Sequence, residues 1–166
     1  MPVDDAHLRF AAELGRRLLE RGWHVATAES CTGGLVAGAI TAIAGSSDWF
    51  ERGFITYSNA AKHDMLGVPR ELIAAHGAVS ETVALAMANG AAARSGAECA
   101  VSVTGIAGPG GGTPGKPVGM VCLGWVLPGR SPIAVTRRIS GDRDAVRAAS
   151  VDAALQGLIG LIDGGN

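Results

Sequence analysis

Apolar residues in the first segment of the chain recur with a helical period. They form one stripe between Asp4 and Arg21, with Leu8 and Leu18 among them, while charged residues take most of the other positions. Gly22 ends the pattern, since glycine readily adopts the left-handed conformation that follows a helix. The spacing therefore predicts a first helix over residues 4–21.

Short apolar runs then alternate with helical patterns. A run is typical of a buried strand when it is brief and bounded by polar or glycine residues. Ser80 is a good N-cap for one of the helices, because its hydroxyl can accept from a first-turn N–H group. We expect strands at 24–28, 50–57 and 99–104, and helices at 35–44, 59–66, 69–76 and 81–94.

The last part of the chain predicts a hairpin followed by a helix. Two strand-like runs, 118–127 and 133–139, flank the turn residues 128–131. Asp142 can cap a final helix, in which apolar residues from Val151 to Ile162 recur at i, i+4, i+7 and i+11. Such a helix should lie on the sheet.

The order of these elements indicates the fold class. Strands and helices alternate in the first part, which favours parallel pairing, and the hairpin adds antiparallel pairing. We therefore expect an α/β fold, a three-layer α/β/α sandwich with a mixed β-sheet. No linker or repeat divides the sequence, so residues 1–166 are expected to form one domain.

Composition narrows the classes of partner. The 166 residues include 14 Lys and Arg against 15 Asp and Glu, with no basic run, so we expect no nucleic-acid partner. Apolar stretches are interrupted well before the roughly 20 residues that cross a bilayer, and the N-terminus is acidic. We expect no membrane partner and a cytoplasmic protein.

The spacing of the cysteines and histidines argues against a metal-binding site and against disulfide bonds. Cys31, Cys99 and Cys122 are odd in number and form no CxxC pair, which favours a reducing compartment. The histidines form no HExxH or similar pair. We expect no metal and no cofactor.

The segment 27–34 carries the clearest chemical signal. Ser30 sits where a strand turns into a helix, next to the first N–H groups of that helix, which can stabilise an oxyanion or a phosphate. A ligand could approach the backbone closely at Gly33 and Gly34. In the alternative interpretation, Ser30 and Thr32 simply cap the helix. Cys31 is a competing nucleophile, ranked lower because it has no spacing that marks a Cys-His pair.

A serine needs a base, and the segment 54–62 offers one. Lys62 is one of only two lysines and falls about a turn into the predicted helix. A lysine buried in an apolar pocket has a lowered pKa and can act as a general base. Tyr57, at a strand end, could relay the proton or donate to the oxyanion. The alternative is an ordinary solvated lysine.

The segment 104–117 is a glycine-rich loop that follows a strand. Six glycines and three prolines occupy the 13 residues from 105 to 117, which excludes a helix or strand there. Exposed N–H groups of such a loop can bind a phosphate, with Lys116 adding charge. The loop lacks the ending of a P-loop, so binding of ATP is not supported. A surface loop without function is the alternative.

Together these motifs resemble the C-terminal domain family of the competence/damage-inducible protein CinA. The resemblance covers nearly the whole chain. It rests on Ala28-Glu29-Ser30-Cys31-Thr32-Gly33-Gly34, Tyr57-Ser58-Asn59-x-x-Lys62, Gly77-Ala78-Val79-Ser80 and Thr104-Gly105-Ile106-Ala107-Gly108-Pro109-Gly110-Gly111-Gly112. Because the matched domain fills the chain, we expect the stand-alone form of the family.

The resemblance implies an activity and assigns residues to it. The family's activity is nicotinamide-nucleotide amidase, which converts nicotinamide mononucleotide to nicotinic acid mononucleotide and ammonia, and the family implies homodimers or higher homo-oligomers. Ser30 matches the nucleophile, Lys62 the base, and Tyr57 a nearby tyrosine. The expected substrate-binding residues are Cys31, Thr32, Gly33, Gly34, Asn59, Thr104, Gly105, Gly108, Gly110 and Gly111.

Two other functions remain open on the sequence. One is a non-catalytic nucleotide-binding or regulatory dimer that keeps the pocket without turnover. The other is an amidase for another small carboxamide.

Overall fold

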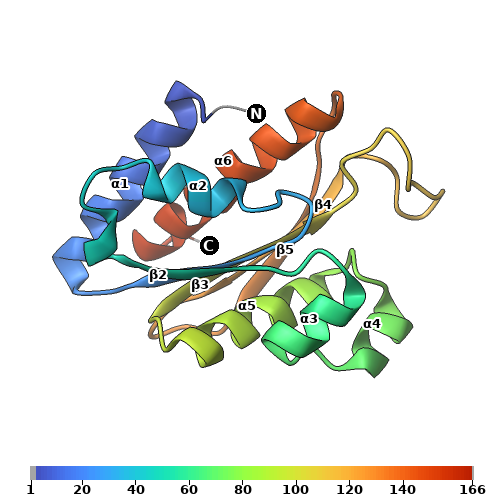
Figure 1. Cartoon of the computed structure of the whole chain (residues 1–166), viewed down its shortest axis with the longest axis horizontal. Helices are drawn as coiled ribbons and strands as arrows, with labels where there is room; N and C mark the ends of the chain where they lie inside the picture. The colour runs from blue at the N-terminus through green and yellow to red at the C-terminus, as the bar shows by residue number, and fades with distance from the viewer. Residues whose placement is uncertain (1–2, 166) are drawn as a thin grey trace.

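The computed structural model describes residues 3–165, which form one five-stranded mixed sheet with helices on both faces (Figure 1). The strand order is β2-β1-β3-β4-β5; the first three strands are parallel, and β4 and β5 are antiparallel to their neighbours. The strands are β1 (Val25–Glu29), β2 (Phe50–Ile55), β3 (Cys99–Gly105), β4 (Met120–Val126) and β5 (Ile133–Arg138).

The helices divide into two layers (Figure 1). On one face lie α1 (Asp5–Arg21), α2 (Leu35–Thr41) and α6 (Arg143–Ile162), and on the other lie α3 (Asn59–Leu66), α4 (Arg70–His76) and α5 (Glu81–Ser95). A short 3₁₀ turn, η1 (Ser46–Asp48), precedes β2. This arrangement confirms the predicted single-domain α/β/α sandwich with a mixed sheet.

Each face of the sheet has its own hydrophobic core. The larger core joins α1, α2 and α6 to the sheet through residues such as Leu14, Val36 and Leu155. The smaller one joins α3, α4 and α5 to the opposite face, where Ala26 and Ala100 leave room for the helices. The buried strand β1 contributes residues to both cores, which fits its run of five buried positions.

Polar caps set the helix boundaries that the sequence predicted. Asp4, Ser80 and Asp142 each accept a first-turn N–H at the start of α1, α5 and α6. Gly22 follows α1 in the left-handed conformation, with φ 65°. The helix expected over 35–44 is shorter than predicted and ends at Thr41.

Helix α6 is long and apolar enough to cross a membrane by length and composition alone. Ser150, Gly157 and Gly160 interrupt its large apolar residues, so the sequence alone predicts no membrane-spanning segment there. In the fold it is a core helix: Val151, Leu155 and Leu158 are fully buried against α1 and the sheet. Its apolar face is thus part of the hydrophobic core between α1 and the sheet.

The parallel strands end together at one edge of the sheet, which is where α/β folds bind ligands. Glu29, the last residue of β1, pairs with Ile55 of β2 and with Val103 of β3. The residues that follow each strand are therefore neighbours in space, although they are far apart along the chain.

Candidate active site

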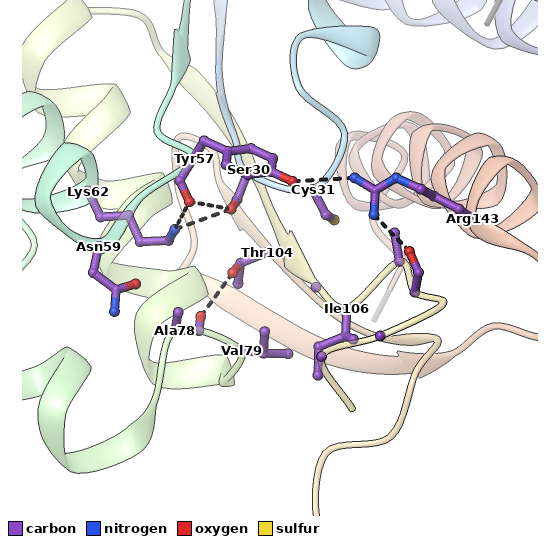
Figure 2. Close-up of a pocket in the computed structure, with 15 residues that line it drawn as sticks. Ser30, Cys31, Tyr57, Asn59, Lys62, Ala78, Val79, Thr104, Ile106 and Arg143 are labelled. Atoms are coloured by element: carbon purple, nitrogen blue, oxygen red, sulfur yellow. Dashed lines mark hydrogen bonds between the residues drawn. The ribbon is translucent and has the colours of Figure 1, made fainter. Parts of the chain in front are cut away.

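Ser30 and Lys62 meet at this edge (Figure 2). The N–H of Ser30 donates to the carbonyl of Val103 at 2.9 Å, which continues the β1–β3 ladder by one residue and fixes the serine backbone. Lys62 comes from the first turns of α3, which Ser58 caps by accepting from an N–H at 3.0 Å. The Lys62 Nζ lies 3.2 Å from the Ser30 Oγ.

The amine of Lys62 is buried among main-chain carbonyls. The residue is 1% exposed, and its Nζ donates to the carbonyl of Thr56 at 3.0 Å and to that of Tyr57 at 3.3 Å. Within residues 3–165 no carboxylate lies at ion-pairing distance from this amine. Burial lowers the pKa of Lys62, because desolvation penalises the charged form.

This geometry is suited to a general base. A neutral amine has two N–H donors and one lone pair. When its two N–H groups donate to the carbonyls of Thr56 and Tyr57, the lone pair of the amine is left to accept from the third neighbour, the hydroxyl of Ser30. The arrangement can therefore draw the serine proton toward Nζ. The interpretation of Lys62 as a solvated surface residue is wrong.

Cys31 is next to the serine, but its thiol is a poor nucleophile at neutral pH. It is 6% exposed. Burial is the main reason that its pKa is raised to about 11; the Glu29 carboxylate also raises the pKa, while a hydrogen bond from the residue's own N–H and the nearby Arg147 and Lys62 lower it. Since the thiolate is the reactive form, the electrostatics favour Ser30 over Cys31.

Glu29 caps helix α2, which corrects two expectations from the sequence. Its carboxylate is 1% exposed and accepts from the N–H of Val36 at 2.9 Å, the N–H of Ala37 at 3.0 Å and the hydroxyl of Thr32 at 2.7 Å. Neither Ser30 nor Thr32 caps the helix. The N–H groups of Val36 and Ala37, in the first turn of α2, are therefore taken and cannot stabilise an oxyanion, contrary to the expectation for the start of this helix.

The N–H of Cys31, in the expected oxyanion segment 31–34, is a donor that these helix contacts do not use. Gly33 donates to the carbonyl of Ser30 and Leu35 to that of Thr32, whereas no main-chain carbonyl within residues 3–165 accepts from the Cys31 N–H. It immediately follows the serine. Arg147 holds the same turn from behind, donating to the carbonyl of Cys31 at 3.1 Å.

A cavity of about 280 Å³ opens in front of Ser30 and Lys62, close to the roughly 300 Å³ at which small-molecule sites begin. Ten residues singled out from the sequence line it: Ser30, Cys31, Tyr57, Asn59, Lys62, Thr104, Gly105, Gly108, Gly110 and Gly111. The other three, Thr32, Gly33 and Gly34, belong to the turn behind Ser30 and are not among its lining residues.

Tyr57 enters the site in two ways (Figure 2). Its carbonyl oxygen lies 3.4 Å from the Ser30 Oγ and accepts from Lys62. Its side chain is directed away from these two atoms, and its hydroxyl lies 3.3 Å from a guanidinium nitrogen of Arg143. The structure therefore places the Tyr57 phenol beside Arg143 rather than beside the serine.

Sequence reasoning did not identify Arg143 as a site residue. It is the first residue of α6, donates to the carbonyl of Gly108 at 2.8 Å and lines the cavity. Ala78, Val79, Ile106 and Ala107 also line the cavity. The motif around Ala78 was visible in the sequence, and Arg143 lies in the last segment that resembles the family, but nothing in the sequence placed it near the serine.

The glycine-rich loop forms one wall of the cavity. Thr104 precedes it and is itself held by a hydrogen bond from its hydroxyl to the carbonyl of Ala78 at 2.9 Å. Lys116, considered above as an extra positive charge for a phosphate, instead donates to the carbonyl of His76 and is not among the lining residues.

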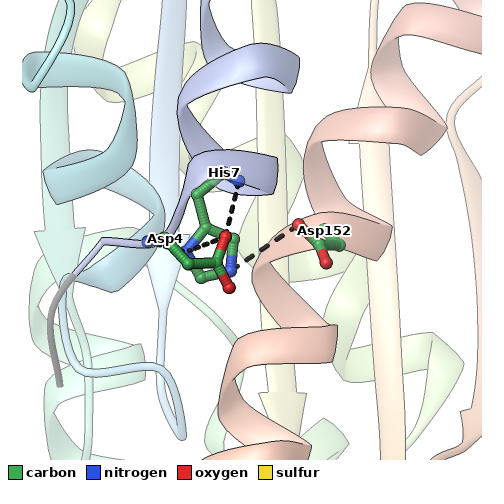
Figure 3. A group of neighbouring side chains, drawn as sticks. All are labelled: Asp4, His7 and Asp152. Atoms are coloured by element: carbon green, nitrogen blue, oxygen red, sulfur yellow. Dashed lines mark hydrogen bonds and ion pairs between the residues drawn. The ribbon is translucent and has the colours of Figure 1, made fainter.

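A separate group could hold a metal ion by geometry alone. Ligand atoms of Asp4, His7 and Asp152 lie within 4.8 Å of one another, and none of these residues lines the cavity (Figure 3). The His7 ring is already engaged, with Nδ1 3.4 Å from the N–H of Asp4 and Nε2 3.1 Å from the carbonyl of Ala148. These contacts describe a helix cap that ties α1 to α6.

Comparison with known proteins gives consistent matches. Residues 7–162 match the family model described as the CinA C-terminal domain. The "Nicotinamide-nucleotide amidohydrolase PncC" of Escherichia coli (strain K12) is 52% identical over 156 residues, which are 94% of this chain and 94% of that protein.

Two further relatives differ in how much of their own length this chain covers. The crystal structure of "competence/damage inducible protein CihA" from Agrobacterium tumefaciens superimposes with a TM-score of 0.93 at 47% identity, covering 97% of this chain and 98% of that one. A "CinA-like protein" of Syntrophobacter fumaroxidans is 54% identical over 142 residues, 86% of this chain. The chain spans only 33% of that protein's length.

Proposed function

The chain belongs to the CinA C-terminal domain family, and from that premise we propose that it hydrolyses the carboxamide of nicotinamide mononucleotide, yielding nicotinic acid mononucleotide and ammonia. The observation that carries the proposal is the buried amine of Lys62, 3.2 Å from the Ser30 hydroxyl at the floor of the cavity. The names of relatives that match along most of their length support the choice of substrate.

In the first half of the reaction, Ser30 Oγ attacks the carboxamide carbon while its proton moves to the Lys62 Nζ. The carbonyl oxygen becomes an oxyanion, and the N–H of Cys31 is the donor that stabilises it. When the intermediate collapses, the C–N bond breaks. Lys62 returns its proton to the departing nitrogen, so ammonia leaves and an acyl ester remains on Ser30.

In the second half, water attacks the ester carbon and gives a proton to the same amine. The ester bond breaks, the proton returns to the Ser30 oxygen, and the acid product leaves. The net reaction converts one amide and one water to one acid and one ammonia. Lys62 takes up and returns a proton in each half, so it is the only base that the reaction needs. The carbonyls of Thr56 and Tyr57 hold that base in place.

The wall built from Thr104, Gly105, Gly108, Gly110 and Gly111, together with Asn59, is suited to the ribose and phosphate of the substrate. Binding these remote groups would position the carboxamide at Ser30. Tyr57 acts in this proposal through its carbonyl on the Ser30 and Lys62 pair.

Ammonia release from nicotinamide mononucleotide in EDTA, by the native chain and by Ser30→Ala, tests the function. We expect release by the native chain and a loss of about 1,000-fold or more in the variant. The matched control is Ser47→Ala, an exposed serine of η1, which should keep full activity. Equal release by Ser30→Ala and the native chain would overturn the assignment.

The same proteins separate the alternatives. Covalent labelling of Ser30 by a serine-reactive probe supports an enzyme, whereas ligand binding without labelling or release supports a regulatory module. Release from carboxamides that lack the nucleotide, at rates equal to those with it, supports an amidase of a different specificity.

Two further proposals concern the cellular location and the oligomeric state of the protein. We infer a cytoplasmic location, supported by three buried and unpaired cysteines, Cys31, Cys99 and Cys122. A homodimer or higher homo-oligomer stays a prediction, and light scattering on the purified chain measures it.

A further inference from the structure

Arg147 lies behind the turn that carries the nucleophile, residues 30–34, and donates to two carbonyls of that turn. It is a half-buried residue of α6 and does not line the cavity. Its Nε donates to the carbonyl of Cys31 at 3.1 Å, and its Nη2 donates to that of Thr32 at 3.3 Å. Because a guanidinium is planar and rigid, two such bonds fix the direction of both carbonyls as well as their distance.

These bonds fix the peptide groups on which the direction of the Cys31 N–H depends. Gly33 donates to the carbonyl of Ser30 at 3.0 Å, which holds the peptide that contains this N–H. The next peptide is held at the Cys31 carbonyl by Arg147, and no main-chain N–H within residues 3–165 donates to that carbonyl. In a trans peptide the N–H points away from the C=O, so carbonyls that are held also set where the N–H groups point.

The charge of Arg147 acts on the same turn. Within residues 3–165 no carboxylate lies at ion-pairing distance from this guanidinium. Burial is the largest effect on the pKa of the Cys31 thiol and raises it, while the Glu29 carboxylate raises that pKa and the Arg147 cation lowers it. The two charges therefore oppose each other beside Ser30. An oxyanion that forms there is disfavoured by Glu29 and favoured by Arg147.

We propose that Arg147 is a positioning residue for the amidase reaction: it holds the turn so that the Cys31 N–H meets the oxyanion, and its charge offsets that of Glu29. This rests on the proposed function, because it concerns the oxyanion of that reaction. Arg147 acts from outside the cavity and through the turn. Since the oxyanion forms only after Ser30 attacks, the contribution is to kcat, with KM nearly unchanged.

The test measures kcat and KM for ammonia release from nicotinamide mononucleotide by Arg147→Ala and Arg147→Lys. In Arg147→Ala we expect kcat to fall about 10- to 100-fold, the scale of a small misplacement at a reacting centre. Arg147→Lys keeps the charge without the planar pair of donors, so it should recover only part of the loss. Full activity of Arg147→Lys would overturn the positioning role.

The matched control is Arg130→Ala. Arg130 also donates to two main-chain carbonyls, those of Leu161 at 3.0 Å and Gly165 at 2.9 Å, near the other end of α6 and away from the cavity. Both alanine variants should lose stability in denaturant unfolding, but only Arg147→Ala should lose kcat. Equal losses of kcat in the two variants, or a loss in Arg147→Ala confined to KM, would overturn the proposal.

Added guanidinium ion separates positioning from folding. The free ion can enter the space left in Arg147→Ala and donate to the same two carbonyls. We expect millimolar guanidinium, well below denaturing concentrations, to raise kcat of Arg147→Ala several-fold and to leave Arg130→Ala unchanged. If Arg147→Ala does not fold, Arg147→Lys carries the comparison of kcat with KM. No rescue of a folded Arg147→Ala would contradict the role of the two bonds.

Labelling of Ser30 by a fluorophosphonate separates this proposal from the function itself. The serine Oγ forms a bond to phosphorus, fluoride leaves, the serine proton moves to Lys62, and the phosphoryl oxygen takes the place of the oxyanion. The labelling rate should fall about 10-fold or more in Arg147→Ala. Labelling that depends on Arg147 without ammonia release by the native chain would leave the positioning role standing while the amidase fails. Ammonia release with equal kcat in the native chain and Arg147→Ala would do the reverse.

Discussion

The Lys62 amine reaches the Ser30 hydroxyl at 3.2 Å across 32 residues of sequence. The parallel pairing of β1 and β2 makes this possible, because it brings the end of one strand beside the start of α3. Main-chain carbonyls complete the surroundings of the amine, so its ability to accept a proton is set by burial and not by a neighbouring carboxylate.

Activity should therefore rise with pH as Lys62 loses its proton. Because burial lowers the pKa of Lys62, the midpoint is expected below the ordinary lysine value of about 10.4. The neutral amine is the active form, so kcat/KM is high above the midpoint and falls below it. A pH–rate profile measures this.

The matched variants for that profile are Lys62→Arg and Lys116→Arg. Arginine stays protonated, so Lys62→Arg should be inactive at every pH tested. Lys116 does not line the cavity, and its replacement should leave the midpoint in place. A flat profile in the native chain would contradict the role of Lys62.

The thiol of Cys31 should react slowly with an alkylating reagent at pH 7. Its pKa is raised to about 11 by burial, so the thiolate fraction is very small at neutral pH and grows as the pH approaches that value. Mass spectrometry of the alkylated chain at several pH values measures the rate. Rapid modification of Cys31 at pH 7 would make the cysteine a real rival to Ser30.

Much of this fold could be predicted because its signals are local. The predicted caps Ser80 and Asp142 bind N–H groups only a few residues away, and the helix over 59–66 was predicted with the boundaries observed. Each depends on a pattern contained within one segment of the chain.

The parts that could not be predicted depend on contacts between distant segments. Arg143 lies 86 residues from Tyr57, whose hydroxyl it meets. The capping of α2 by Glu29 required knowing that this carboxylate turns toward the helix. The direction of the Tyr57 side chain is likewise a matter of packing, which one sequence does not specify.

Replacing Glu29 by Ala should destabilise the protein and reduce activity. The change leaves the N–H groups of Val36 and Ala37 without their acceptor, and each unsatisfied donor costs about 1–3 kcal/mol. Denaturant unfolding measures the loss. Glu51→Ala, which removes an exposed carboxylate paired with Arg52, should leave the free energy of unfolding nearly unchanged. Similar losses in the two variants would contradict the capping role.

Two glycines offer opposite outcomes for the same substitution. A Cβ at Gly90 of α5 would overlap the carbonyl oxygen of Leu66 in α3, so Gly90→Ala should cost about 1–3 kcal/mol and displace the helix that carries Lys62. Gly38 in α2 has open space around it, and Gly38→Ala should stabilise by about 0.5–1 kcal/mol. Thermal unfolding of both variants checks this, and a neutral Gly90→Ala would contradict the close approach of α3 and α5.

The site draws on two separate regions of the chain, and this has an evolutionary consequence. Ser30 follows β1, Lys62 lies in α3 after β2, and the glycine loop follows β3, whereas Arg143 comes from α6 after the hairpin. A relative could exchange the residue at the start of α6 and acquire a different ligand preference while inheriting the same reactive pair.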